Sequence, residues 1–144
     1  MWKAIVNAWN GVEEPTNADS RSKRAPVTTL KFQQVVQEVK NNDPNTVIVD
    51  VREPSEYEVV SIPGSINVPY RSHPNGFALD DAQFKQTFNV NKPSKGKRLI
   101  FLCASGKRAS GAEEVASNDG YLNTAVYTGS MNDWVENGGD KLKF

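Results

Sequence analysis

The segment from Leu99 to Val115, LIFLCASGKRASGAEEV, constrains the fold more than any other part of the chain. Its first four residues, Leu99–Leu102, are apolar and favour a buried strand. Cys103, the only cysteine in the sequence, follows them directly. Residues 104–108 then form a short polar stretch with one glycine and two adjacent cations, and residues 109–118 are typical of a helix. The order strand, cysteine, basic loop and helix predicts an anion-binding site that contains a nucleophile.

The start of a helix is a favourable place for a thiolate. It presents unpaired backbone N–H groups and the positive end of the helix dipole, so an anion held there is partly neutralised. Such a field lowers the pKa of a cysteine from about 8.5 towards a range of roughly 3.5 to 7.5. Lys107 and Arg108 add positive charge and are candidates for holding an anionic substrate. The alternative is an unreactive cysteine that ends a core strand, but the cationic loop favours a reactive thiolate at Cys103.

Apolar periodicity elsewhere predicts alternating helices and strands. A first helix is expected to be capped by Thr28 or Thr29, to bury Leu30 and to end at residues 41–44. Strands are expected over residues 46–51, 65–68, 99–102 and 124–127, and further helices from Pro54, Asp80, Ala109 and Gly129. This alternation predicts an α/β fold with a mainly parallel sheet of about five strands and helices on both faces. Ligands bind beyond the carboxyl ends of the strands in such sheets.

The amino-terminal 25 residues are expected to be separate from a folded domain over residues 26–144. Four apolar residues share one stripe of a helix over residues 1–12: Trp2, Ile5, Val6 and Trp9. The polar, turn-rich residues that follow are typical of a linker or arm. The helix either docks on its own domain, binds a partner or serves as a targeting or membrane-surface helix. Acidic residues soon after it disfavour a targeting peptide, and nearby basic residues restore part of that character.

The composition excludes several classes of function. The chain has 17 Lys and Arg against 17 Asp and Glu, so no general basic face for nucleic acid is expected. No apolar run approaches the roughly 18 residues that a membrane-spanning helix needs. One cysteine excludes an internal disulfide and fits a reducing, intracellular compartment. Because the chain also has a single histidine, a zinc site is not expected, and no cofactor is implied.

Three ordered motifs resemble the signatures of the single-domain rhodaneses, a family of sulfurtransferases. They are Asp50-Val51-Arg52-Glu53 with Glu56-Tyr57 and Ile62–Pro69, the loop Cys103–Arg108, and Gly129-Ser130-Met131 with Trp134 and Gly138. The resemblance covers residues 28–143, and the length and the segment PYRSHP are similar to small fungal mitochondrial thiosulfate sulfurtransferases. Two departures stand out. Val60-Ser61 replace the usual Gly-His, and Ser130 replaces the second glycine of the closing signature.

The resemblance implies a covalent sulfur transfer at Cys103. In this family the cysteine takes a sulfane sulfur from thiosulfate, releases sulfite and rests as a persulfide. A related persulfide donor is the alternative source of the sulfur. The sulfur then passes to cyanide or to a thiol, and a thiol protein is a possible acceptor. The proposed substrate-binding residues are Arg52 and the loop itself, namely Ala104, Ser105, Gly106, Lys107 and Arg108. The resemblance also implies a mitochondrial protein, with the cytoplasm as the alternative.

The loop residues suit this chemistry when their side chains are considered one by one. Backbone amides after Cys103 are expected to stabilise the persulfide and the departing sulfite. Arg108 has a planar fork that suits bidentate contact with a sulfonate-like group, whereas Lys107 is a mobile point charge. Ser105 either donates a hydrogen bond to the sulfur or begins the turn. Gly106 is expected to permit a backbone shape or a close approach that a side chain would block.

Residues outside the loop are assigned on weaker grounds. Asp50 is expected to form an ion pair at the end of its strand. Arg52 is either the partner in that pair or a second cation that binds substrate. Arg71 is a further candidate for the rim of the site, while His73 is expected at the surface and Trp134 in the core.

Two other functions compete with sulfur transfer. Cysteine phosphatases use a similar loop, but only four residues separate Cys103 from Arg108, one fewer than in the phosphatase pattern. The smaller loop suits a sulfur atom better than a phosphoryl group. The second alternative is a non-catalytic rhodanese module that binds a partner or senses persulfides. The complete cysteine loop disfavours an inactive module.

Overall fold

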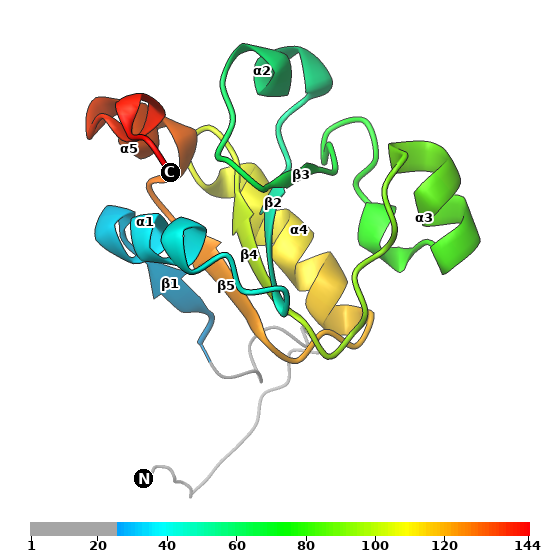
Figure 1. Cartoon of the computed structure of the whole chain (residues 1–144). Coiled ribbons are helices and arrows are strands. Elements are labelled where there is room, and N and C mark those ends of the chain that lie inside the picture. Colours follow the sequence, from blue (N-terminus) through cyan, green and yellow to red (C-terminus); the bar gives the residue numbers. More distant parts are fainter. Residues whose placement is uncertain (1–25) are drawn as a thin grey trace, which may run out of the picture.

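The fold is built around a sheet of five parallel strands. The computed structural model describes residues 26–144 and orders the strands β1-β5-β4-β2-β3 (Figure 1). The strands are β1 (Thr28–Leu30), β2 (Thr46–Asp50), β3 (Ile66–Asn67), β4 (Arg98–Leu102) and β5 (Thr124–Tyr127). Every neighbouring pair is parallel. The predicted α/β fold with a mainly parallel sheet is therefore confirmed.

Five helices connect and cover the strands. They are α1 (Phe32–Asn41), α2 (Pro54–Val59), α3 (Asp81–Phe88), α4 (Lys107–Asn118) and α5 (Ser130–Glu136), with short 3-10 turns at η2 (Gly76–Ala78) and η3 (Gly139–Lys141). Pro54 occupies the first turn of α2, where a missing N–H is tolerated. Asp80 caps α3, because its side chain accepts a hydrogen bond from the Gln83 amide at 2.8 Å. Both helix starts agree with the sequence prediction.

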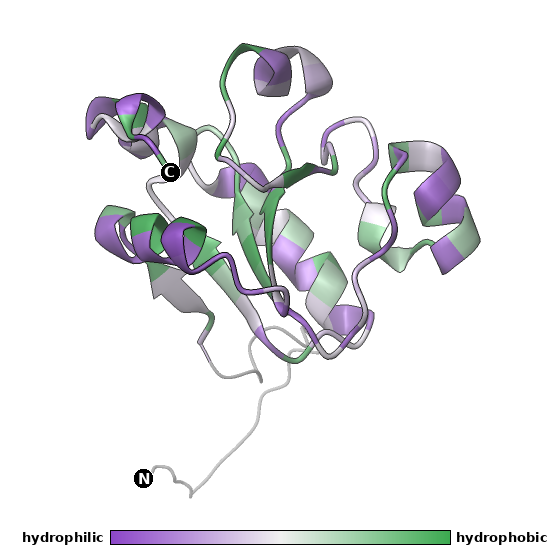
Figure 2. Cartoon of the chain, in the orientation of Figure 1, coloured by the Kyte–Doolittle hydropathy of each residue, from purple (hydrophilic) through white to green (hydrophobic). Residues whose placement is uncertain are grey.

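Alternating side chains of the strands form two hydrophobic clusters, one on each face of the sheet. In β4, Leu99 and Phe101 pack on the side of α3 and α4, while Ile100 and Leu102 pack on the side of α1 and α5. This alternation follows from the two-residue period of a strand, and both faces are apolar because helices cover both. Figure 2 shows hydrophobic residues concentrated on the central strands and polar residues on the outer sides of the helices. Trp134 lies fully buried in the second cluster, as predicted.

The predicted start of the first helix was wrong. Thr28 and Thr29 do not cap a helix, because Thr28–Leu30 is strand β1, which pairs with β5 at the edge of the sheet. Helix α1 begins at Phe32, after Lys31. Leu30 is buried as expected, but it reaches the core from the strand. The predicted helix over residues 1–12 lies outside the described residues.

The carboxyl ends of β2 and β4 lie side by side in the middle of the sheet. Asp50, the last residue of β2, is in register with Leu102, the last residue of β4. The chain then continues into Arg52 and α2 on one side and into Cys103 and α4 on the other. Figure 1 shows α2 standing beyond this edge of the sheet. Within residues 26–144, no helix is both long and apolar enough to span a membrane.

Candidate active site

Cys103 is placed directly at the end of β4, as the sequence predicted. The residue is only 1% exposed and joins the cluster on the α4 side of the sheet. Burial alone would fit an unreactive core cysteine. However, Sγ accepts a hydrogen bond from the Gly106 amide, with a distance of 2.9 Å from N to Sγ. This contact is polar and favours a sulfur that carries negative charge.

The loop after Cys103 curls back over the sulfur because of Gly106. This residue has a φ of +108°, a conformation that residues with a side chain rarely adopt. A Cβ atom there would lie 2.8 Å from the Thr128 carbonyl oxygen, so the close approach also requires glycine. Helix α4 begins at the next residue, Lys107, two residues earlier than predicted. The amides of its first turn have no acceptor within the helix and remain as donors beside the loop.

The start of α5 holds the main chain of Cys103 in place. Ser130 Oγ accepts a hydrogen bond from the Cys103 amide at 3.1 Å and donates one to the Tyr127 carbonyl at 2.8 Å. The Met131 amide donates to the Cys103 carbonyl at 2.9 Å. Ser130 is fully buried and has a φ of +59°, which explains why glycine is usual at this position. The sequence identified Ser130 only as a departure from the family pattern and did not predict its contact with Cys103.

Arg108 is paired with a carboxylate on α2. Its Nη1 donates to Glu56 Oε1 at 3.0 Å, and its Nη2 donates to Glu56 Oε2 at 3.3 Å. These hydrogen bonds lower the pKa of Glu56 and raise the pKa of Arg108. The negative charges of Cys103 and Glu53 raise the pKa of Arg108 further. The fork that was expected to face substrate therefore already has an anionic partner within the protein.

Glu53 is a second acidic residue near Arg108. Its Oε2 is buried and has no hydrogen-bond partner within the part of the chain that the structure describes. Its amide donates to Glu56 Oε1 at 3.0 Å, so Glu53 also fixes the Glu56 carboxylate. The sequence motif contains both acids, but it gave no reason to assign either of them to the site.

Arg52 forms the ion pair with Asp50 that was one of its two predicted alternatives. The residue is 4% exposed, and its Nη2 lies 2.8 Å from Asp50 Oδ2. It also donates to the carbonyl oxygens of Glu56 and Val60, which join the end of β2 to α2. These contacts occupy the terminal nitrogens of Arg52, which a substrate would also need. They therefore favour the ion pair over a contact with substrate. The Val60 contact also holds the segment in which the usual Gly-His is replaced.

The remaining predicted residues lie in different environments. Ser105 and Lys107 are exposed in the loop, and the structure gives no hydrogen bond from the Ser105 hydroxyl to Sγ within residues 26–144. Arg71 and His73 are exposed in the segment after β3, and His73 packs edge-on against Phe88 with ring centroids 5.3 Å apart. No group of three potential metal ligands occurs among the described residues.

The comparisons with known proteins identify the family. The model of the rhodanese-like domain matches residues 32–137. The chain belongs to the rhodanese-like domain family. A thiosulfate:glutathione sulfurtransferase from Saccharomyces cerevisiae is 55% identical over 142 residues, which are 99% of this chain and 99% of the relative. The mitochondrial thiosulfate sulfurtransferase RDL2 of the same yeast is 42% identical over 112 residues, or 78% of this chain and 75% of the relative.

A solved structure from the same yeast shows the same architecture. A Saccharomyces cerevisiae protein determined at atomic resolution is 55% identical, with a TM-score of 0.81 over 83% of this chain and 100% of that chain. The predicted rhodanese family and fold are thus confirmed. Because the two yeast relatives of this chain are named sulfurtransferases, the predicted enzyme class, a sulfurtransferase, is confirmed as well.

Proposed function

We propose that this rhodanese moves a sulfane sulfur from thiosulfate to a thiol or to cyanide through a persulfide on Cys103. The observation that carries the proposal is the contact between the Gly106 amide and Sγ at the start of α4. It places the sulfur where donors of the first helical turn and the helix dipole stabilise an anion. Two yeast relatives named for their use of thiosulfate support this choice of donor, and one named for glutathione supports a thiol acceptor.

The first half of the reaction forms the persulfide. The Cys103 thiolate attacks the outer sulfur of thiosulfate, a new S–S bond forms, and the S–S bond of thiosulfate breaks. Its electron pair leaves with sulfite. The thiolate and thiosulfate together carry three negative charges, and so do the persulfide anion and sulfite, so no proton is needed. The amides of residues 104–108 stabilise the sulfur anion, as donors of an oxyanion hole do.

The second half returns the enzyme to its thiolate. The acceptor attacks the outer persulfide sulfur, and the electron pair of the S–S bond returns to Cys103 Sγ. Splitting one transfer into two steps is the advantage of a covalent intermediate. Lys107 is exposed at the loop and attracts the anionic donor, while Arg108 contacts its sulfonate end after leaving Glu56. Arg52 acts as a positioning residue through its contacts with Asp50 and α2.

Two further assignments belong to this proposal. The sheet and the site lie within residues 26–144, so we assign sulfur transfer to this part and leave residues 1–25 as a separate segment. A relative named as mitochondrial supports the mitochondrion as the location of the protein. Microscopy of a tagged full-length chain tests this location, and a cytosolic signal would contradict it.

Steady-state kinetics test the proposed reaction. Because sulfite leaves before the acceptor reacts, double-reciprocal plots against thiosulfate at several acceptor concentrations should give parallel lines. Cys103→Ser should abolish turnover while its circular dichroism matches that of the wild type. Intersecting lines together with an active Cys103→Ser variant would contradict the covalent scheme.

A further inference from the structure

The donor site of the protein is electrically unusual. An enzyme that binds the dianion thiosulfate needs positive charge near the nucleophile, and Arg108 is the loop cation with a fork suited to it. Yet both terminal nitrogens of Arg108 are directed at Glu56. Glu53 adds a second negative charge that acts on Arg108. A dianionic donor therefore meets a cation that is already neutralised.

The same ion pair fastens the cysteine loop to the rest of the fold. At its first residue, the loop is held by the Asn132 amide, which donates to the Ala104 carbonyl at 3.0 Å. At its last residue, it is held by the ion pair between Arg108 and Glu56. The Arg108 side chain is 17% exposed and the Glu56 side chain is 37% exposed. Cys103 itself is only 1% exposed. The ion pair therefore holds one end of the loop that follows a buried sulfur.

We propose that Glu56 is a positioning residue that sets donor specificity by competing with the anionic donor for Arg108. The proposal rests on the sulfur-transfer function stated above. When thiosulfate binds, its sulfonate end takes the place of the Glu56 carboxylate on Arg108. When sulfite leaves, Glu56 pairs with Arg108 again, which favours release of the dianionic product. Glu56 thus weakens binding of anionic donors and speeds the exchange of sulfite.

The Glu56 carboxylate is charged at neutral pH. Hydrogen bonding from Arg108 lowers its pKa below the usual value, in spite of partial burial. The competition is therefore present at neutral pH. It is lost only as the pH falls through this lowered pKa, when Glu56 becomes protonated and releases Arg108.

The decisive variant is Glu56→Gln, because the amide keeps an oxygen that accepts the Glu53 amide hydrogen and caps α2. Removing the charge should lower the KM for thiosulfate about two- to five-fold, the range expected for a partly exposed ion pair. It should strengthen inhibition by sulfite by a similar factor, with a smaller change in kcat. Glu56→Asp keeps the charge but draws it back by one methylene, and it should shift both constants in the same direction by less.

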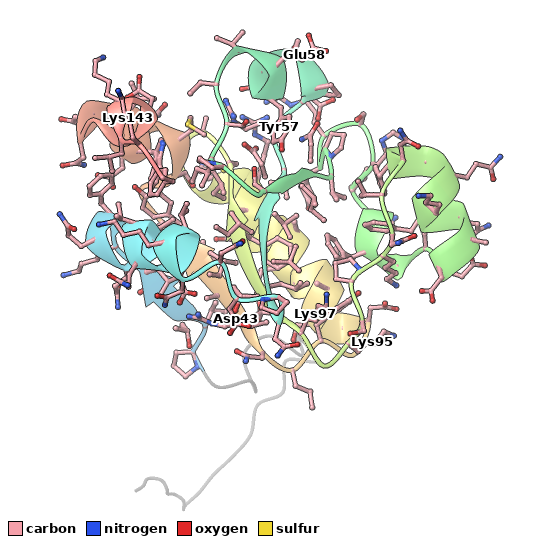
Figure 3. The ribbon with its side chains drawn as sticks, viewed as in Figure 1. Asp43, Tyr57, Glu58, Lys95, Lys97 and Lys143 are labelled. Carbon is pink, nitrogen blue, oxygen red and sulfur yellow. The ribbon has the colours of Figure 1, made fainter. Side chains whose placement is uncertain are left out.

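Glu58→Gln is the matched control for this test. Glu58 lies on the same helix and is exposed, and Figure 3 shows it on the outer side of α2. The substitution removes the same charge without touching Arg108, so the KM for thiosulfate should remain that of the wild type. An unchanged or higher KM in Glu56→Gln, or an equal effect in Glu58→Gln, would overturn the proposal.

A second measurement separates this proposal from the reaction itself. Cys103 is alkylated with iodoacetate, which is an anion, and with iodoacetamide, which is neutral and of similar size. Glu56→Gln should raise the ratio of the iodoacetate rate to the iodoacetamide rate about two- to five-fold over wild type. Glu58→Gln should leave this ratio unchanged. An equal ratio in all three proteins would overturn the proposal. If thiosulfate gives no persulfide but the ratio still rises, the proposed donor is wrong and the competition for Arg108 stands.

Discussion

Ser130 supports Cys103 through the main chain. Its hydroxyl oxygen accepts a hydrogen bond from the Cys103 amide, and the neighbouring Met131 amide donates one to the Cys103 carbonyl oxygen. The Cys103 side chain takes no part in these two hydrogen bonds, and its backbone is fixed by the start of α5. The cost of this arrangement is a serine with a φ of +59°, a conformation that disfavours residues other than glycine.

Two substitutions of Ser130 separate the hydrogen bond from the backbone strain. Ser130→Ala leaves the buried Cys103 amide without a partner, so the free energy of unfolding should fall by about 1–3 kcal/mol. Ser130→Gly loses the same bond but relieves the positive φ, and should be more stable than the alanine variant by roughly 1–2 kcal/mol. Urea denaturation checks both values. Equal stability of alanine and glycine variants would contradict the assigned strain.

Glu56 and Ser130 are site residues whose contacts the sequence does not reveal. The cysteine loop was predictable because its residues are contiguous and their chemistry is local. The partners of the loop lie far away in the sequence: Glu56 is 52 residues from Arg108, and Ser130 is 27 residues from Cys103. Their contacts depend on how α2 and α5 meet the end of β4, which only the folded chain determines.

At the scale of elements, the loop between β4 and α4 depends on one glycine. Gly106→Ala should cost about 1–3 kcal/mol of stability through backbone strain. It should also slow persulfide formation at least about tenfold, because the amide that contacts Sγ is displaced. Gly96→Ala is the control, since a Cβ there meets nothing within 4 Å and the expected change is below about 0.5 kcal/mol. A Gly106→Ala variant with wild-type rates would contradict this role.

The carboxyl end of α4 is tied to the segment after α3 by a buried lysine. Lys92 Nζ, in a side chain that is 5% exposed, donates to Asp119 at 2.7 Å and to the Leu79 carbonyl at 2.8 Å. Desolvation raises the pKa of Asp119, but hydrogen bonds from Lys92 and Lys95 outweigh it, so the pKa lies below its usual value. Asp119 therefore stabilises the fold above its unfolded pKa, and this stabilisation is lost as the pH falls through the lowered folded value.

Asp119→Asn tests this link through its dependence on pH. The variant should lose about 1.5–3 kcal/mol of stability at neutral pH, because the buried Lys92 side chain loses its carboxylate partner. The difference from wild type should shrink below the ordinary Asp pKa of 3.8. Asp140→Asn is the control, because Asp140 lies 3.9 Å from an exposed lysine. A difference that stays constant when urea denaturation is repeated at acidic pH would contradict the prediction.

The element boundaries show where local sequence signals are insufficient. β2, β4 and β5 were predicted because their runs of apolar residues are long enough to stand out in the sequence. β1 was missed because it has three residues, of which only Leu30 is buried, and a helical apolar pattern follows at once. Its strand conformation comes from pairing with β5, almost a hundred residues away along the chain. Such pairing is not visible in the short segment itself.

At the scale of the whole molecule, one part of the chain contains the sheet, both hydrophobic clusters and the site. A protein of residues 26–144 should therefore unfold cooperatively and form the Cys103 persulfide at the wild-type rate. Thermal unfolding and a thiosulfate assay of the shortened and full-length proteins check this. A shortened protein that folds but loses the reaction would assign residues 1–25 a part in catalysis.

The covalent step itself is tested most directly by mass. Reduced full-length protein is incubated with thiosulfate, separated from it, analysed intact and then treated with cyanide. The persulfide mechanism predicts a gain of one sulfur atom that maps to Cys103, its removal by cyanide with release of thiocyanate, and no gain in Cys103→Ser. A folded, reduced protein that turns over thiosulfate without gaining this mass, or that gains it without Cys103, would contradict the persulfide mechanism.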